Sequence, residues 1–328
     1  MLWTILFEIL FPIILIIFVI IVLLKGIKSR RTEQNLMTLD EFITDWLYDH
    51  GQGHKIDEQF NKMKHEPTGF IYMPLTYRGG KFFLKLGLNS NDVSILNLLF
   101  SFIIFWGVII ASRGHNMALF SQQPFYGVWF IPLAFLVLFT GVIDGVDGAI
   151  ARLSDNKTAS GAWFDNIIDR ISDTLLLVCL IPETLVIIPE TTINLEWIIW
   201  TNILLMFIYE YMRARHQSLG LREVKPYVAE RPTRIMLNTT FFLIYGISSF
   251  TILLTKLIDP SSVLIWAVSH SGVINWSMII YQVLFLGLMV FSSIKLANYS
   301  YKNLKIIDSK SKQNNKNQKK KPMEVLNK

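Results

Sequence analysis

The sequence predicts an all-α integral membrane protein in which seven helices cross the bilayer. Hydrophobic residues make up 52% of the 328 residues and aromatic residues 13%, and the mean hydropathy is +0.41. These values are too apolar for an ordinary soluble domain. The apolar residues gather in stretches near the roughly 20 residues that a helix needs to cross a membrane. The expected spans are residues 2–24, 93–112, 127–150, 161–187, 197–212, 235–257 and 273–296.

The distribution of basic residues predicts the orientation, because Lys and Arg are retained on the cytoplasmic side. With the N-terminus outside, 29 of the 31 Lys and Arg residues fall in cytoplasmic segments, and Arg113 and Lys256 remain outside. The first apolar stretch is followed by basic residues rather than by the small residues of a cleavage site, so a retained anchor is expected. The protein is therefore expected to be a multi-pass protein of the cytoplasmic membrane.

Four aspartates between two apolar stretches are the candidate functional residues: Asp144, Asp147, Asp165 and Asp169. Their i,i+3 and i,i+4 spacings put each pair on one face of a helix. A carboxylate near the bilayer centre costs roughly 2.5–3.5 kcal/mol by insertion scales, so the cluster needs cations. Oxygen ligands without a nearby Cys or His favour Mg²⁺ or Mn²⁺. The pattern predicts two such ions and phosphoryl chemistry, with the site on the cytoplasmic side.

Residues 144–169 read DGVDGAIARLSDNKTASGAWFDNIID and match the pattern D-x2-D-G-x2-A-R-x8-G-x3-D-x3-D without a gap or substitution. On this motif the chain is identified as a member of the CDP-alcohol phosphotransferase family, also called CDP-alcohol phosphatidyltransferases. The resemblance covers about residues 88–296. It implies a six-helix membrane core, to which the first span is an addition. It also implies a phospholipid-synthesis transferase of EC 2.7.8 type, commonly a homodimer, that moves diacylglycerol or archaeol phosphate from a CDP-lipid to an alcohol and releases CMP.

The resemblance also implies roles for single residues. The four aspartates would hold two Mg²⁺ or Mn²⁺ ions, and Asp169 would also be the general base for the acceptor hydroxyl. In residues 88–94, Asn91 and Ser94 keep the polar positions of the family's L-T-P-N-x-x-T segment, whereas Ser90 replaces the proline. A role as helix N-cap explains Asn91 equally well. The residues implied to contact the CDP-lipid are Asn91, Asp144, Gly148, Ala151, Arg152 and Gly161.

The acceptor is expected to be inositol phosphate. The arginines after Asp169 and in the R-A-R and E-R-P-x-R segments resemble those of the phosphatidylinositol-phosphate and archaetidylinositol-phosphate synthases, the closest branch. There the matching arginines hold the acceptor phosphate, which suits their planar, bidentate guanidinium groups. His216 and Thr233 depart from that pattern, so glycerol 3-phosphate, serine or another alcohol are alternatives. The implied phosphate-binding residues are Arg170, Arg213, Arg215, Arg231 and Arg234.

Asp173 follows the motif on the same helix face. It is either a further polar group of the acceptor cavity or an ion-pair partner of an arginine, and the second role is favoured because intramembrane charges usually find partners. A cation transporter is the alternative from another functional class, since acidic clusters also line ion pathways. The proximity of Arg152 and Lys157, both expected at the cytoplasmic side, disfavours it.

The expected domain organisation is an N-terminal anchor (1–31), a cytoplasmic or interfacial segment (32–87), the membrane domain (88–298) and a basic disordered tail (299–328). The tail lacks apolar periodicity, and no folded module indicates a nucleic-acid partner. A capping box at residues 38–41 opens an amphipathic helix that lies on the membrane or packs under the bundle. No chemistry is expected from this helix or from the three nearby histidines, His50, His54 and His65. The turn at residues 153–160 is expected to be a solvated connector. Cys179 is expected in the core.

Overall fold

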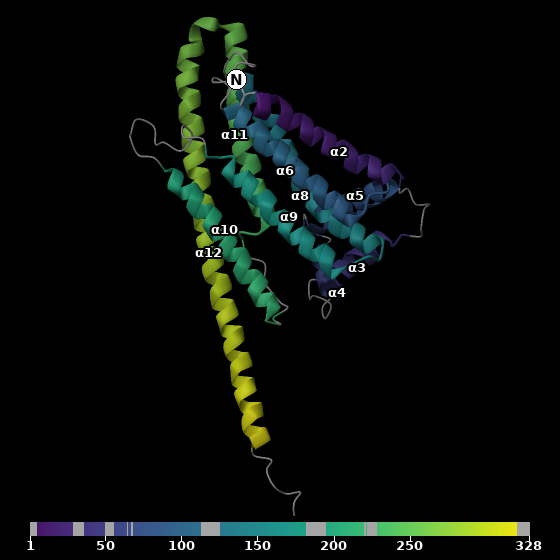
Figure 1. The fold of residues 1–328 in the computed structure, drawn as a ribbon. Coiled ribbons are helices and arrows are strands. Elements are labelled where there is room, and N and C mark those ends of the chain that lie inside the picture. Colours follow the sequence, from purple (N-terminus) through teal and green to yellow (C-terminus); the bar gives the residue numbers. More distant parts are fainter. Residues whose placement is uncertain are drawn as a thin grey trace, which may run out of the picture.

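The computed structural model describes residues 5–28, 36–49, 56–63, 65–66, 68–112, 125–181, 195–219, 221 and 228–319. All regular structure in these ranges is helical, which confirms the all-α prediction. A helix lies at each of the seven expected spans (Figure 1). These helices are α2 (Phe11–Lys28, preceded by the π-helical turn η1, Ile5–Leu10), α6 (Ser90–Ser112), α8 (Phe130–Leu153), α9 (Ala159–Val178), α10 (Glu196–Ser218), α11 (Arg231–Ile258) and α12 (Val263–Lys319).

Within the described residues, five of these helices are long and apolar enough to cross a membrane by themselves. The five are η1 with α2, α6, α8, α11 and α12. The other two, α9 and α10, are less apolar because they carry charged residues in their sequences, such as Asp165 and Asp169 on α9 and Glu210 on α10. The chain is a multi-pass membrane protein.

The N-terminal helix α2 lies antiparallel along α6 (Figure 1). At one end Lys25 Nζ pairs with Asp92 Oδ1 at 2.5 Å. Toward the other end the indole Nε1 of Trp106 donates to the carbonyl oxygen of Phe7 at 2.9 Å. Only 11% of the residues in the most apolar stretch of this first helix are buried. Most of its surface is therefore available to lipid.

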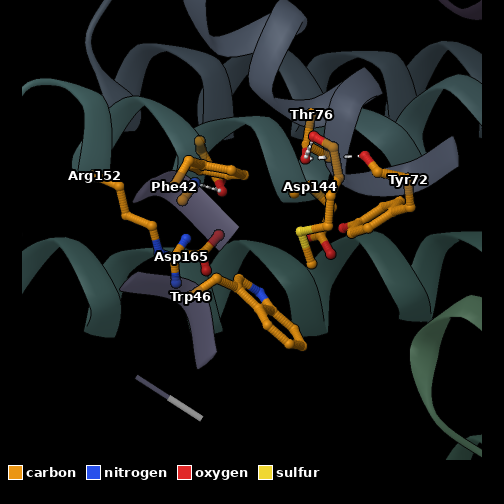
Figure 2. Close-up of a pocket in the computed structure, with 11 residues that line it drawn as sticks. Phe42, Trp46, Tyr72, Thr76, Asp144, Arg152 and Asp165 are labelled. Atoms are coloured by element: carbon orange, nitrogen blue, oxygen red, sulfur yellow. Dashed lines mark hydrogen bonds between the residues drawn. The ribbon is translucent and has the colours of Figure 1, made fainter. Parts of the chain in front are cut away.

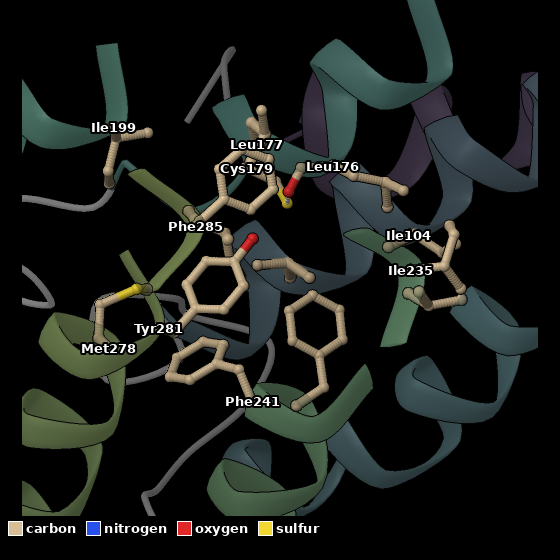
Figure 3. Close-up of a cluster of buried hydrophobic side chains, with 14 of the residues drawn as sticks. Ile104, Leu176, Leu177, Cys179, Ile199, Ile235, Phe241, Met278, Tyr281 and Phe285 are labelled. Atoms are coloured by element: carbon tan, nitrogen blue, oxygen red, sulfur yellow. Dashed lines mark hydrogen bonds between the residues drawn. The ribbon is translucent and has the colours of Figure 1, made fainter. Parts of the chain in front are cut away.

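The main core is formed by residues of α6 and of α8 to α12, and it contains several aromatic side chains (Figure 3). Phe241 of α11 stacks on Tyr281 of α12 with ring centroids 5.6 Å apart. The Tyr281 hydroxyl donates to Asn238 Oδ1 at 2.6 Å, so its polar end is satisfied inside the bundle. Cys179 is buried in this cluster, as predicted.

The segment before α6 folds against the end of the bundle where α8 meets α9 (Figure 1). It comprises α3 (Leu39–Asp49), α4 (Ile56–Met63), η3 (Thr68–Tyr72) and α5 (Met73–Lys85). The predicted capping box is confirmed: Thr38 N donates to Glu41 Oε2 at 2.7 Å, and Glu41 N donates to Thr38 Oγ1 at 3.4 Å. The first of these bonds lowers the pKa of Glu41. Phe42 is buried in one cluster with Ala149 of α8, so α3 packs under the bundle.

The C-terminal region differs from the prediction of a disordered tail from residue 299. Helix α12 is continuous for 57 residues and ends at Lys319. At 1.5 Å per residue it is about 85 Å long, well beyond a hydrocarbon core of roughly 30 Å. Figure 1 shows it projecting past the other helices. The physical reason is that residues 299–319 contain no Gly or Pro, and Lys and Gln are good helix formers.

Gly246 of α11 lets this helix approach α8 closely. A Cβ atom at Gly246 would lie 2.5 Å from Ile131 Cγ1 and 2.7 Å from the Ile131 backbone nitrogen. Gly246→Ala is therefore expected to destabilise the protein by about 1–3 kcal/mol, the usual cost of overpacking. The measurement is the Tm of the purified protein in detergent.

The matched control is Gly287→Ala on α12, where a Cβ atom would meet nothing within 4 Å. Replacing a helical glycine by alanine in open space is expected to leave the Tm unchanged or raise it, since alanine is favoured by about 1 kcal/mol. Equal Tm values for both variants would contradict the close packing of α11 on α8.

Candidate active site

The four motif aspartates lie on two neighbouring helices joined by a short turn. Asp144 and Asp147 are near the C-terminal end of α8, Asp165 is in the first half of α9, and Asp169 is at its middle. One carboxylate oxygen each from Asp144, Asp165 and Asp169 lie within 4.8 Å of one another. Asp147 and Asp165 line the same two cavities. The predicted convergence of the two pairs is therefore confirmed.

The donor chemistry of this cluster fits a hard divalent cation. The group consists of carboxylates alone, without a His or Cys among the described residues that form it. Asp165 Oδ1 is buried and accepts no hydrogen bond from the described part of the chain. Such an oxygen is costly unless a cation binds it. Asp147 is oriented by two donors, Ser94 Oγ at 2.6 Å and the Gly148 backbone nitrogen at 2.5 Å.

Arg231, at the start of α11, reaches into the aspartate cluster. Its Nη1 donates to Asp144 Oδ1 and to Asp169 Oδ1. Its Nε lies 3.4 Å from Asp173 Oδ1. The guanidinium thus joins Asp144 and Asp169 to a second, deeper group of charges.

This second group is a buried ion-pair network around Asp173 and Glu210. Arg234 Nη2 pairs with Asp173 Oδ2 at 2.6 Å and with Glu210 Oε1 at 3.1 Å. Arg170 pairs with the same two residues, at 3.2 Å and 3.1 Å. Asp173 therefore has the arginine partners that were favoured for it. Glu210 was missed by sequence reasoning, although an acidic residue in an apolar helix was a signal for it.

The remaining two predicted phosphate-binding arginines lie apart from this network. Arg213 Nη1 pairs with Glu230 Oε2 at 2.8 Å, and Tyr209 donates to the same carboxylate at 2.8 Å. Arg215 is exposed, and its guanidinium contacts Ser218 of its own helix at 3.5 Å. The structure therefore does not bring Arg215 to the other arginines, because it projects from another side of α10.

A cavity of about 310 Å³ lies beside the aspartates and contains most of the predicted CDP-contacting residues. Asn91 lines it from the first turn of α6. The helix N-cap is the neighbouring Asn89, whose Oδ1 accepts from Asp92 N at 2.9 Å. Asn91 is therefore not the cap, which removes the alternative explanation for it. The other predicted residues in the lining are Gly148, Ala151, Arg152 and Gly161.

An adjoining cavity of about 220 Å³ is lined by Asp144 together with residues from the N-terminal segment. Figure 2 shows Trp46 and Tyr72 beside Asp144 and Asp165. A Cβ atom at Gly145 would lie 2.1 Å from the Tyr72 hydroxyl, so this glycine is needed for the approach of Tyr72. Sequence reasoning missed this wall, whose residues are Phe42, Trp46, Tyr72, Met73 and Thr76.

The α8–α9 turn is also bound to the N-terminal segment. Lys157 Nζ pairs with Asp45 Oδ2 at 2.6 Å and with Asp49 Oδ2 at 3.0 Å. Partial burial lowers the pKa of Lys157, but these hydrogen bonds outweigh it, so the net shift is upward. The expectation of a purely solvated connector was wrong at Lys157. Of the three histidines, His65 lies in an exposed turn, and His50 and His54 lie outside the described residues.

Comparison with known proteins finds one matching family and several related proteins. The family model described as CDP-alcohol phosphatidyltransferase matches residues 88–284. An archaetidylinositol phosphate synthase of Methanothermobacter thermautotrophicus is 34% identical over 107 residues, which cover 32% of this chain and 49% of that protein. A bifunctional IPC transferase and DIPP synthase of Archaeoglobus fulgidus is 31% identical over 122 residues, or 36% of this chain and 24% of that protein. An uncharacterized protein of Aquifex aeolicus is 38% identical over 90 residues, or 27% and 44%.

The chain spans less than half of the length of each of these relatives. The family model, in contrast, matches more than half of this chain. The matched residues include α8 and α9 with all four converging aspartates, as well as the arginines at the start of α11. This match shows that the chain belongs to the CDP-alcohol phosphatidyltransferase family.

Proposed function

We propose that the protein is a membrane transferase of phospholipid synthesis, which moves a phosphatidyl-type group from a CDP-lipid to an alcohol and releases CMP. The observation that carries this proposal is the convergence of Asp144, Asp165 and Asp169 beside a cavity of about 310 Å³. That volume is within the usual range of ligand sites, ~300–1,000 Å³. The membrane setting of the helices suits a substrate with lipid tails.

The proposed ligands of two divalent ions, Mg²⁺ or Mn²⁺, are Asp144, Asp147, Asp165 and Asp169. Bound divalent ions would neutralise negative charge on the diphosphate of the CDP-lipid. The bond from Ser94 to Asp147 fixes the orientation of that carboxylate, as outer-shell hydrogen bonds do for metal ligands. The unsatisfied Oδ1 of Asp165 supports its role as a ligand.

The proposed general base is Asp169. It takes the proton of the acceptor hydroxyl while the hydroxyl oxygen forms a bond to the β-phosphorus of the CDP-lipid. The bond between that phosphorus and the bridging oxygen breaks, and CMP leaves with the bonding electrons. Asn91, Gly148, Ala151, Arg152 and Gly161 hold the nucleotide in the larger cavity.

The proposed acceptor is inositol phosphate. Arg170, Arg231 and Arg234 all lie within 3.4 Å of Asp173, so three guanidinium groups converge at one place. Since Arg231 also contacts Asp169, an acceptor phosphate bound by these arginines would bring its hydroxyl groups near the base. The name of one relative, archaetidylinositol phosphate synthase, supports an inositol-containing acceptor.

The orientation and assembly are also part of the proposal. The bias of Lys and Arg toward one set of connecting segments supports a site that faces the cytoplasm, in the cytoplasmic membrane. A homodimer stays a prediction from the family.

The central test measures CMP release from the purified protein with Mg²⁺ and a CDP-lipid. Release is expected with inositol 1-phosphate and not with glycerol 3-phosphate, serine or free inositol. Asp169→Asn, which removes the base, is expected to lower kcat by ~10²–10⁴. Release with another acceptor would overturn the acceptor assignment alone, whereas full activity of Asp169→Asn would overturn the role of Asp169.

The metal assignment is tested by Mn²⁺ binding, followed by electron paramagnetic resonance. Asp165→Asn is expected to weaken Mn²⁺ binding by at least tenfold, or about 1.4 kcal/mol, because a charged ligand is lost. The matched control is Asp308→Asn, an exposed position on α12. Equal Mn²⁺ affinity of both variants and the unchanged protein would contradict the assignment.

Truncation of a buried, paired arginine and truncation of an exposed arginine are expected to have different effects on stability. Arg234→Ala leaves Asp173 and Glu210 buried without this partner. The free energy of unfolding is therefore expected to fall by about 3–5 kcal/mol, which would be observed as a lower Tm in detergent. Arg215→Ala, at an exposed position, is expected to change stability by less than about 0.5 kcal/mol and to leave the KM for the acceptor unchanged. A raised KM for the acceptor in Arg215→Ala would instead show that Arg215 takes part in acceptor binding.

A further inference from the structure

Helix α3 borders the candidate active site although it lies outside the residues that the family model matches, 88–284. Asp45 and Asp49 are four residues apart, so they share one face of the helix. Phe42 and Trp46, also four residues apart, line the smaller cavity together with Asp144, Asp147 and Asp165. Helix α3 therefore places Phe42 and Trp46 at the cavity of the motif aspartates, and it places Asp45 and Asp49 beside the turn between α8 and α9.

The carboxylate pair holds both basic residues near the nucleotide cavity. Arg152 Nη2 lies 3.1 Å from Asp49 Oδ2, and Arg152 Nε lies 3.7 Å from Asp45 Oδ2. The same two aspartates bind Lys157. Single exposed ion pairs contribute little to stability, but the Arg152 side chain is only 13% exposed. Two acidic and two basic groups thus form one neutral cluster at the cavity.

The geometry of Arg152 indicates which part of its guanidinium is left for a ligand. Asp49 Oδ2 pairs with Nη2, whereas Asp45 Oδ2 lies 3.7 Å from Nε, too far for a hydrogen bond. Nη1 lies over Gly148, since a Cβ atom there would be 3.0 Å from it. Gly148, Arg152, Lys157 and Asp49 all line the larger cavity. Asp45 and Asp49 therefore lie along the Nε–Nη2 edge of the guanidinium, whereas Nη1 lies at Gly148, which also lines the cavity.

We propose that Asp45 and Asp49 are positioning residues for the nucleotide. They hold Arg152 and Lys157 where these side chains bind the diphosphate of the CDP-lipid, and they fasten α3 as a wall of that site. A guanidinium held in place loses less conformational freedom when it binds a phosphate. This inference rests on the proposed function.

The test measures binding of CDP and of cytidine to the full chain by isothermal titration calorimetry, in detergent with Mg²⁺. The double variant Asp45→Asn/Asp49→Asn is expected to bind CDP about tenfold more weakly, equivalent to about 1.4 kcal/mol. Cytidine lacks the diphosphate, so its affinity is expected to stay the same. In the CMP-release assay the KM for the CDP-lipid rises, and kcat changes by less than about twofold. Asp45→Glu/Asp49→Glu, which keeps both charges, is expected to restore most of the CDP affinity.

The matched control is Asp40→Asn/Asp57→Asn, which removes the same charge from two exposed positions of the same segment. Unchanged or tighter CDP binding in Asp45→Asn/Asp49→Asn would overturn the inference, because the aspartates would then be irrelevant to the nucleotide or compete with it. An equal loss for CDP and cytidine would also overturn it, since the effect would be a general distortion. If the unchanged protein binds no CDP, the proposed function itself fails.

Discussion

The main physical constraint on this structure is that carboxylates buried in a helical membrane bundle must be neutralised or hydrogen-bonded. Asp147, Asp173 and Glu210 are each less than a tenth exposed, and the side chains of Asp144 and Asp169 are 23% and 13% exposed. Isolated carboxylates in such surroundings are strongly destabilising, so each must find a cation or a hydrogen-bond donor. The chain meets this requirement in two ways. Arginines pair with the deeper group, and Arg231 also contacts Asp144 and Asp169, whereas the oxygens of the outer group lie close enough together to hold a divalent ion.

This requirement explains which helices meet. Helices α8 and α9 are joined by a short turn, which brings their aspartate-bearing ends together. Helix α6 contributes Ser94 to Asp147, and the start of α11 contributes Arg231 and Arg234. Helix α10 contributes Glu210, which balances two arginines. Five helices of the membrane domain, α6 and α8–α11, thus contribute polar side chains to the site, whereas the aromatic core between α11 and α12 holds the bundle together away from it.

The N-terminal segment extends the family's matched region in a specific way. Helix α5 packs against α8, and α3 lies beside the turn between α8 and α9. Both cavities at the aspartates have walls from this segment. A region outside the family match is therefore physically part of the candidate site.

The sequence alone determined the class of fold and the centre of the site. Apolar runs of membrane-spanning length located the helices, and the spacing of the four aspartates placed them on matching faces, because both signals are local and follow from helix geometry. Local spacing also identified the capping box at residues 38–41. Only the tertiary structure decided which residues pair over long distances: Glu210 with Arg234, and Asp45 and Asp49 with Arg152. Periodicity shows which residues share a face, but which distant helix covers that face depends on packing of the whole bundle.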